Sequence, residues 1–227
     1  MFTALPPRYD LVNRIVTLGL DKRWRRLAAQ TCLAENPQRV LDLGCGTGDL
    51  TISIARLAGE NTEITGLDYS LPMLERARQE AIKAGIGRRE TFIHGEATHL
   101  PFPDGHFDVV GISFAFRNLT YKNPPGLSHL AEVKRVLKSG GRYVIVESSQ
   151  PANRLIRKLF HFYLRTFVKP VGILLSGNKG AYRYLAESAS LFYSPQEVRD
   201  MLLAAGFRDV SYRPLLFGAA GIHVAVR

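Results

Sequence analysis

The sequence predicts an α/β fold in which a mostly parallel sheet carries helices on both faces. Short apolar runs alternate with segments of helical spacing, which is typical of a parallel sheet with crossover helices. A glycine-rich turn follows the first apolar run, and two strand-like runs at the end of the chain predict an antiparallel hairpin. With 227 residues and 46% hydrophobic content, we expect one core and a single domain over residues 1–227.

The first strand and the turn after it occupy residues 40–49, with the sequence VLDLGCGTGD. Gly44, Gly46 and Gly48 let the backbone turn sharply and leave N–H groups free at the start of a helix, where an anion is well placed. A dinucleotide fingerprint would need its third glycine at the position of Asp49, so the pattern disfavours NAD.

The second and third strands are predicted at residues 63–67 and 91–94. The second is followed by Asp68, about one β-α-β unit after the first strand, and a carboxylate there can accept both hydroxyls of a ribose. The alternative role of Asp68, capping the next helix, is disfavoured because Ser70 is available for it. The loop 95–97 after the third strand lies where an adenine would bind.

Four more strands complete the predicted seven-stranded sheet: residues 107–114, 142–147, 207–213 and 218–226. Residues 127–137 show helical spacing, and Gly140 is expected to end that helix. A capping box of Ser194 and Glu197, with Pro195 at the first helical position, predicts a helix that ends at Gly206.

Two segments are not expected to join the sheet. Residues 9–35, within an N-terminal part over 1–36, should form one or two helices. Residues 151–193 are too long for an ordinary connection and carry aromatic side chains among basic ones, so we expect a helical lid over the strand ends. The alternative is a helical pair that covers a sheet edge with ordinary core aromatics.

The glycine turn, Asp68 and the 95–97 loop follow one another as in class I S-adenosylmethionine (SAM) dependent methyltransferases, which this chain resembles. Four further signatures resemble the ubiquinone/menaquinone biosynthesis C-methyltransferases (UbiE/MenG-like) over nearly the whole chain. They are YDLVN at 9–13, LPFPDGHFD at 100–108, FRNLT at 116–120 and YRYLAES at 182–188. This resemblance implies a Rossmann-like fold, SAM as the cofactor and methylation of a prenylated quinol.

The resemblance also implies roles for individual residues. The cofactor contacts would be Asp42, Gly44, Gly46, Thr47, Gly48, Asp68, Tyr69, Glu96, Ala97 and Ser113. The catalytic pair would be Arg117 and Asn118, and the substrate contacts would be Tyr9, Asn13, Tyr182 and Tyr184, with no metal. Phe116, Val12 and Asp21 depart from the family's usual leucine, methionine and histidine, which leaves the identity of the quinol open.

The chemistry of the expected reaction assigns work to the catalytic pair. A quinol ring carbon becomes nucleophilic when a neighbouring phenol, with a free pKa of ~10, loses its proton. Arg117 can stabilise the phenolate, but a guanidinium stays protonated and is a poor base, so a bound water is the expected proton carrier. Asn118 can orient that water or the hydroxyl. The alternative is a surface arginine beside a helix-capping asparagine.

Composition limits the partners and the location. The net charge of +10 suits an anionic membrane surface, nucleic acid or simple solubility. No nucleic-acid-binding module is visible in the sequence, so we do not expect the protein to bind nucleic acid. Arg165, Lys169 and Pro170 interrupt the apolar stretch 159–175, so it is not predicted to cross a membrane. Cys32 and Cys45 are predicted to be buried and reduced, and with no secretory signal visible we expect a cytoplasmic protein.

Several alternatives stay open. The aromatic and basic residues of 151–193 predict a quinol pocket that touches the membrane peripherally. In a second interpretation the SAM site is the same, but the substrate is another small lipophilic acceptor or, less readily, RNA. A non-catalytic SAM-binding partner of quinone enzymes is a third reading, and a homodimer is also open. His94, His99 and His106 are expected to be ordinary polar residues and not metal ligands.

Overall fold

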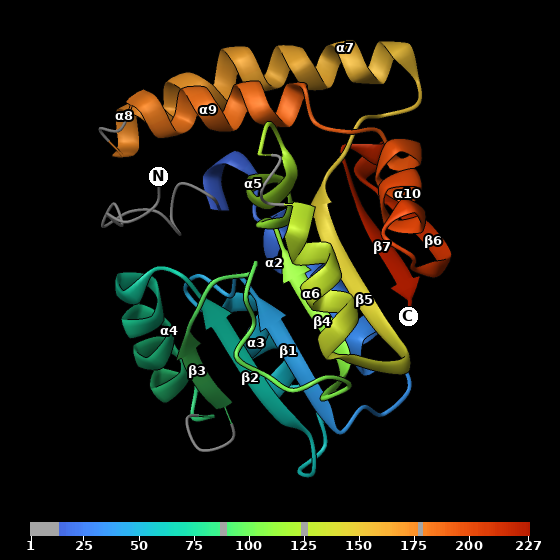
Figure 1. Ribbon diagram of the computed structural model, residues 1–227. Helices are drawn as coiled ribbons and strands as arrows, with labels where there is room; N and C mark the ends of the chain where they lie inside the picture. The colour runs from blue at the N-terminus through green and yellow to red at the C-terminus, as the bar shows by residue number, and fades with distance from the viewer. Residues whose placement is uncertain (1–13, 87–89, 124–126, 177–178) are drawn as a thin grey trace.

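Seven strands form one twisted sheet in the order β3-β2-β1-β4-β5-β7-β6 (Figure 1). The computed structural model describes residues 14–86, 90–123, 127–176 and 179–227. The strands are β1 (Arg39–Leu43), β2 (Glu63–Asp68), β3 (Glu90–His94), β4 (Phe107–Ser113), β5 (Leu137–Ser148), β6 (Arg208–Leu215) and β7 (Ala220–Val226). Neighbouring strands from β3 to β5 run parallel, and β7 pairs antiparallel with both β5 and β6. The predicted α/β class and the hairpin at the sheet's edge are confirmed.

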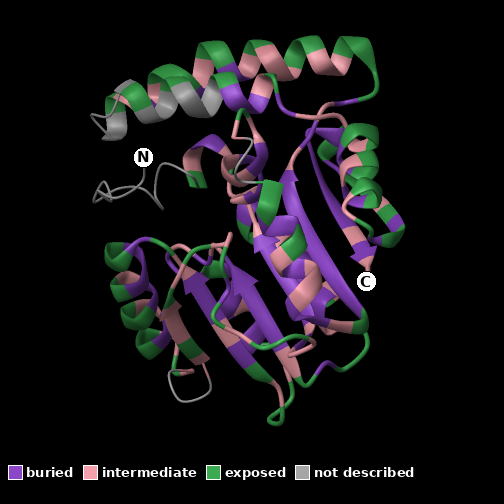
Figure 2. Cartoon of the chain, in the orientation of Figure 1, coloured by how far each residue is buried: buried purple, intermediate pink, exposed green. Residues whose placement is uncertain are grey.

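Helices cover both faces of the sheet because successive strand residues are buried on opposite sides. The helices are α2 (Leu20–Leu33), α3 (Asp49–Ala55), α4 (Leu71–Lys83), α5 (Phe116–Thr120), α6 (Ser128–Val136), α7 (Arg154–Tyr163), α8 (Lys169–Ser176), α9 (Lys179–Ser190) and α10 (Pro195–Ala204). Val40 belongs to a core cluster with α2 and α3, whereas Leu41 belongs to a second cluster with α6 and α10. Burial follows this layering, with buried strands between helices whose outer faces are exposed (Figure 2).

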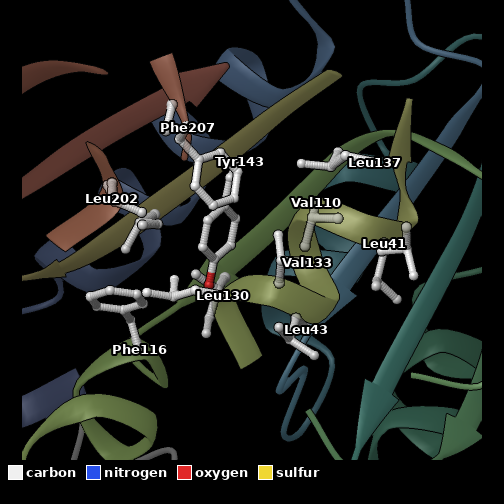
Figure 3. Close-up of a cluster of buried hydrophobic side chains, with 14 of the residues drawn as sticks. Leu41, Leu43, Val110, Phe116, Leu130, Val133, Leu137, Tyr143, Leu202 and Phe207 are labelled. Carbon is white, nitrogen blue, oxygen red and sulfur yellow. The ribbon is translucent and has the colours of Figure 1, made fainter. Parts of the chain in front are cut away.

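The second cluster fixes the position of α5, which begins at the end of β4. Phe116, the first residue of α5, is fully buried beside Tyr143 of β5 and Leu130 of α6 (Figure 3). Its ring lies 6.3 Å from that of Tyr143 in an edge-on arrangement, which aromatic pairs favour. This anchor places the next two residues, Arg117 and Asn118, at the carboxyl edge of the sheet.

The boundary between α6 and β5 differs from the sequence prediction, which began this strand only at residue 142. The helix expected to end at Gly140 ends at Val136, and Leu137 already begins β5. Leu137 pairs with Phe107 of β4, and the register then shifts so that Arg142 pairs with Val109. The pairing of Leu137 therefore takes precedence over helical spacing, and Gly140 serves a bulged part of the strand with a φ of 77°.

The capped helix follows the prediction. Ser194 accepts a hydrogen bond from the backbone N–H of Glu197, and the Glu197 carboxylate accepts one from the N–H of Ser194. This reciprocal pair begins α10, and Gly206 follows it with a φ of 83°. Burial of Val198 and Leu202 then holds α10 against the sheet.

Residues 151–176 and 179–193 form a helical layer across the carboxyl ends of the parallel strands (Figure 1). The layer consists of α7, the π-helical turn Leu164–Val168, α8 and α9. A small separate core holds it to the N-terminal part of the chain, because Val16 packs with Leu164, Val168 and Ala189. The layer is helical and lies over the carboxyl ends of the strands, and its role as a lid stays a prediction.

Candidate active site

A cavity of about 500 Å³ lies between the carboxyl ends of the parallel strands and the helical layer. Its walls come from the glycine turn after β1, the ends of β2 and β4, α2, and the helices of the layer. The sheet order reverses here, since β2 lies on one side of β1 and β4 on the other. Open α/β sheets bind their ligands in the crevice at such a switch point.

The glycine turn needs its glycines for conformation and for space. Gly44, Gly46 and Gly48 have φ values of 66°, 55° and 85°, a region that other residues enter only at a cost. A Cβ on Gly44 would lie 2.9 Å from the Cβ of Ala115, whereas a Cβ on Gly46 would meet nothing within 4 Å. Gly46 lines the cavity, so its backbone is open to a ligand.

Asp42 presents a buried carboxylate with one oxygen in use. Its Oδ2 accepts hydrogen bonds from the backbone N–H of Thr51 at 2.9 Å and from the Thr51 hydroxyl at 2.6 Å. Its Oδ1 is buried without a partner among the residues that the structure describes. Burial raises the pKa of Asp42 to about 7, although the bonds from Thr51 act in the other direction. Oδ1 is therefore a ready acceptor for a donor or cation in the cavity.

Asp68 lines the cavity and is tied to the backbone on both sides. Its Oδ2 accepts from the N–H of Gly46, and its Oδ1 accepts from the N–H of Ser70, both at 2.8 Å. Each oxygen of a carboxylate can accept a second bond, so both stay available to ribose hydroxyls. Ser70 stands at the cap of α4, but its hydroxyl makes no capping bond, so the expectation that Ser70 caps this helix is wrong.

Arg117 and Asn118 meet the cavity at the end of β4. Arg117 is only 5% exposed, which excludes the alternative of a surface arginine. Its Nη1 donates to Ser148 Oγ at 2.6 Å and to Glu147 Oε1 at 3.3 Å. Two buried atoms find no partner in the described part of the chain, the donor Nε of Arg117 and the acceptor Oδ1 of Asn118.

Most of the predicted contacts do come together around this cavity. Ten of them line it: Asp42, Gly44, Gly46, Thr47, Asp68, Tyr69, Ala97, Ser113, Arg117 and Asn118. Gly48 instead caps α3, and Glu96 is exposed and lies outside the cavity lining. Tyr9 and Asn13 lie outside the described residues. Tyr182 and Tyr184 belong to α9, and their side chains also lie outside the described part.

Sequence reasoning missed a charged cluster on α2 that lines the same cavity. Arg25 Nη1 lies 2.7 Å from Asp21 Oδ2 and 3.3 Å from Asp49 Oδ2, and its guanidinium sits over the Phe114 ring at 5.4 Å. Asp21 and Arg25 are four residues apart on a helix, a spacing that could have shown the pair. Nothing in the sequence places Asp49 or Phe114 beside them.

The far wall of the cavity is apolar. It comes from the N-terminal part, the helical layer and the β6–β7 connection, through Val16, Phe160, Tyr163, Leu164, Val168 and Leu216. Two of these, Leu164 and Val168, belong to a π-helical turn, a feature that is often found at functional sites. The cavity therefore joins a polar half at the sheet to an apolar half under the layer.

The histidines do not assemble a metal site. His94 contacts the backbone carbonyl of Tyr69, and His106 stacks on Phe102. Across the described residues, no group of three histidine, cysteine or acidic side chains is gathered for a metal ion. Cys32 and Cys45 are buried and not bonded to one another, as predicted.

Known proteins resemble this chain over its whole length. A model of the ubiE/COQ5 methyltransferase family matches residues 1–227. A Thermus thermophilus protein named demethylmenaquinone methyltransferase is 43% identical over 228 residues, with 100% of each chain covered. A Deinococcus radiodurans protein of the same name is 44% identical, covering 99% of this chain and 90% of its own. The Azotobacter vinelandii ubiquinone/menaquinone biosynthesis C-methyltransferase UbiE is 35% identical, covering 98% of this chain and 87% of its own.

Solved structures share the fold at lower identity. A SAM-dependent methyltransferase from Aquifex aeolicus superposes with a TM-score of 0.62 at 21% identity, covering 95% of this chain and 97% of its own. The SAM-dependent methyltransferase SibL in its apo form gives a TM-score of 0.70 at 21% identity, covering 98% of this chain and 60% of its own. At this identity the likeness concerns the fold, and it agrees with the Rossmann-like class predicted from the sequence.

Proposed function

The chain belongs to the ubiE/COQ5 methyltransferase family, and from this membership we propose that it transfers the methyl group of SAM to a ring carbon of a prenylated demethylquinol. Relatives named for demethylmenaquinone are 40–44% identical, against 34–35% for relatives named UbiE, so a demethylmenaquinol is the favoured acceptor. The observation that carries the proposal is the cavity itself, which joins a polar half suited to SAM with an apolar half suited to a quinol.

The residues of the polar half fit SAM. Open space at Gly46 allows close approach to the backbone, and Asp68 can accept both ribose hydroxyls. The unpartnered Oδ1 of Asp42 suits the ammonium group of the methionine part. Ser113 Oγ is also buried without a partner among the described residues, and it lies at the end of β4 on the cavity wall. When bound, SAM supplies a methyl group already activated by its sulfonium.

Arg117 and Asn118 supply a matched pair of groups for the acceptor ring. Nε of Arg117 is a donor and Oδ1 of Asn118 an acceptor, and neither has a partner among the described residues. A phenolate oxygen accepts from Nε, and the buried guanidinium stabilises its negative charge. Oδ1 accepts from the hydroxyl or from a water that carries the proton away. Both side chains thus serve the nucleophile.

The apolar half is proposed to hold the quinol ring and the first part of its tail. Phe160 and Tyr163 of α7 line it with Leu164 and Val168 of the π-helical turn. Moving a quinol ring and a prenyl chain from water to a pocket of aromatic and branched side chains is favourable, because apolar surface is buried. We therefore propose that residues 151–193 act as a lid within the single domain.

The outer face of α7 supports peripheral contact with a membrane. Leu155, Leu159 and Phe162 are 66%, 59% and 65% exposed and lie on one face of the helix at positions i, i+4 and i+7. Exposed Arg154, Lys158, Arg165 and Lys169 flank this apolar stripe. An apolar stripe beside cations is typical of a helix that lies in the surface of an anionic bilayer.

A membrane contact of this kind places the protein at the surface of the bilayer in which prenylated quinols reside. No helix in the described ranges is long and apolar enough to cross a membrane. We propose a protein of the cytoplasmic side that binds the membrane through α7. A homodimer that buries the same stripe is the competing arrangement, and sedimentation of the protein without lipid separates the two.

Methyl transfer from radiolabelled SAM to a reduced, short-tailed demethylmenaquinone tests the function. Label should enter the organic phase, and mass spectrometry should show a product heavier by one methylene group. Catechols and unmodified RNA serve as parallel acceptors for the alternative readings. Label in either of these and none in the quinol would refute the proposed substrate.

A further inference from the structure

Glu147 lies behind Arg117, at the carboxyl end of β5, and is only 3% exposed. Its Oε2 accepts from the backbone N–H of Arg117 at 3.0 Å, and its Oε1 accepts from Arg117 Nη1 at 3.3 Å. One carboxylate therefore holds Arg117 at both its main chain and its side chain. We propose that Glu147 is the positioning residue that fixes the Arg117 guanidinium for the reaction.

Ser148 closes the arrangement. Its hydroxyl donates to Glu147 Oε1 at 2.9 Å and accepts from Arg117 Nη1 at 2.6 Å, while its backbone N–H donates to Glu147 Oε1 at 2.8 Å. The Arg117 guanidinium, the Ser148 hydroxyl and the Glu147 carboxylate are thus joined by three hydrogen bonds in a closed cycle. Such a cycle fixes the torsion angles of a long side chain that would otherwise have several rotamers.

The hydrogen bonds also decide what Glu147 does. Four donors converge on its two oxygens: Oε1 accepts from Arg117 Nη1 and from the N–H and hydroxyl of Ser148, and Oε2 accepts from the backbone N–H of Arg117. Glu147 does not line the cavity, whereas Arg117 and Ser148 do. It therefore acts through Arg117 and does not take a proton from the substrate.

The charge of Glu147 matters as well as its geometry. A guanidinium 5% exposed needs a negative partner, because an unpaired buried charge is strongly unfavourable. Glu147 supplies that partner through Nη1 and leaves Nε without one among the described residues. Because Glu147 pairs with Nη1, the proposed donor to the phenolate is Nε.

This inference rests on the proposed function, and Glu147→Gln tests it. The amide keeps the shape of the side chain but loses the charge and cannot accept from four donors. We expect kcat for a demethylmenaquinol to fall roughly ten-fold or more, while the Kd for SAM changes by less than about two-fold. The rising limb of the kcat–pH profile should move to higher pH, because the Arg117 guanidinium is no longer held in place by Glu147 and stabilises the phenolate less. Glu147→Asp keeps the negative charge, so its kcat and its pH profile should lie between those of the wild type and Glu147→Gln.

Glu132→Gln is the matched control. Glu132 also holds an arginine and a backbone N–H, through Arg135 Nε at 2.8 Å and Leu100 N at 2.7 Å, and neither it nor Arg135 lines the cavity. The control should lower thermal stability and leave the pH profile unchanged. If Glu147→Gln behaves like the control, with an unchanged kcat and pH profile, Glu147 is merely structural and the inference is overturned.

A second measurement separates this inference from the proposed function. The Arg117 Nε–H signal in a ¹⁵N–¹H NMR spectrum, assigned by its absence in Arg117→Lys, should be slow to exchange in the wild-type protein with SAM. It should broaden or exchange fast in Glu147→Gln. Absence of methyl transfer in the wild type would refute the substrate, yet the NMR signal would still decide the role of Glu147. An unaltered signal in Glu147→Gln would overturn that role.

Discussion

The backbone N–H of Gly46 donates to Asp68 Oδ2 at 2.8 Å and so joins the turn after β1 to the end of β2. The two groups are 22 residues apart in the chain and meet at the switch point of the sheet. The same carboxylate holds the N–H of Ser70. Asp68 thus shapes the glycine turn and faces the cavity at once, and removing it should alter both.

Asp68→Ala should weaken SAM binding by at least ~1–3 kcal/mol, because ribose hydroxyls and the Gly46 N–H lose their acceptor. Isothermal titration measures the change. Asp68→Asn is the informative companion, since its single carbonyl oxygen can hold either Gly46 or Ser70 but not both. Unchanged affinity in a folded Asp68→Ala protein would contradict the assignment.

Arg117→Ala should lower turnover by roughly 10²-fold or more, the scale of a lost electrostatic contact in a transition state. The affinity for SAM should barely change, because Arg117 is proposed to contact the acceptor and its own hydrogen bonds run to Glu147 and Ser148, not to the glycine turn. The substitution leaves Glu147 buried without its cation, so thermal unfolding of the variant must be measured beside its kinetics.

Arg117→Lys keeps a charge but cannot form the same set of bonds to Glu147 and Ser148. It should be more stable than Arg117→Ala and still slow. Near wild-type turnover in either folded variant would show that Arg117 is structural.

The sequence was a good guide to the polar half of the cavity, since glycines, strand ends and caps are local features. Gly44 and Asp68 lie at the ends of β1 and β2, where the sequence predicts them, because each one follows a short apolar run. By contrast, Glu147 was seen only as the end of a strand. Its contact with Arg117 spans 30 residues and depends on β4 pairing with β5 in one register.

The end of α6 was predicted wrongly for a related reason. Helical spacing continued to Leu137, and Gly140 is a plausible stop. The pairing of Leu137 with Phe107 ends the helix earlier, and that pairing depends on a strand 30 residues away. Local signals cannot show which partner a residue near an element boundary will choose.

Asp42 should make stability depend on pH. Burial raises its pKa from 3.8 to about 7, so between these values the folded protein binds a proton that the unfolded chain releases. The free energy of unfolding should therefore fall as pH rises through this window, by a few kcal/mol from this group, and the loss is complete above pH about 7.

Asp42→Asn is the test, because an amide does not titrate and its oxygen can still accept from Thr51. Urea unfolding at pH values across the window should show the variant gaining stability over the wild type as pH rises. The affinity of the wild-type protein for SAM should rise as pH rises, because the ammonium group of SAM prefers the ionised carboxylate of Asp42. A constant stability difference between the two proteins would contradict the burial of a titrating Asp42.

Residues on the outer face of α7 should determine binding to anionic vesicles. Arg157 is a poor probe of this, because its guanidinium already donates to the carbonyls of Pro151 and Ala152. Lys158 is exposed and free of such bonds in the described part of the chain. Lys158→Glu should therefore weaken binding to anionic vesicles by about 1 kcal/mol or more, which flotation would measure. High salt should likewise weaken the binding of the wild-type protein to anionic vesicles.

Leu159→Asn tests the apolar stripe in turn, and Leu203→Asn on α10 is its control, since Leu203 is an exposed leucine 41% accessible on a helix away from the layer. The Leu159 variant should lose flotation on anionic vesicles and keep its affinity for SAM, because the side chain lies outside the cavity lining. The Leu203 variant should float as the wild type does. Equal binding of the wild type to neutral and anionic vesicles, or none to either, would refute the membrane contact. A dimer dissociated by Leu159→Asn in the absence of lipid would assign the stripe to a second copy of the chain instead.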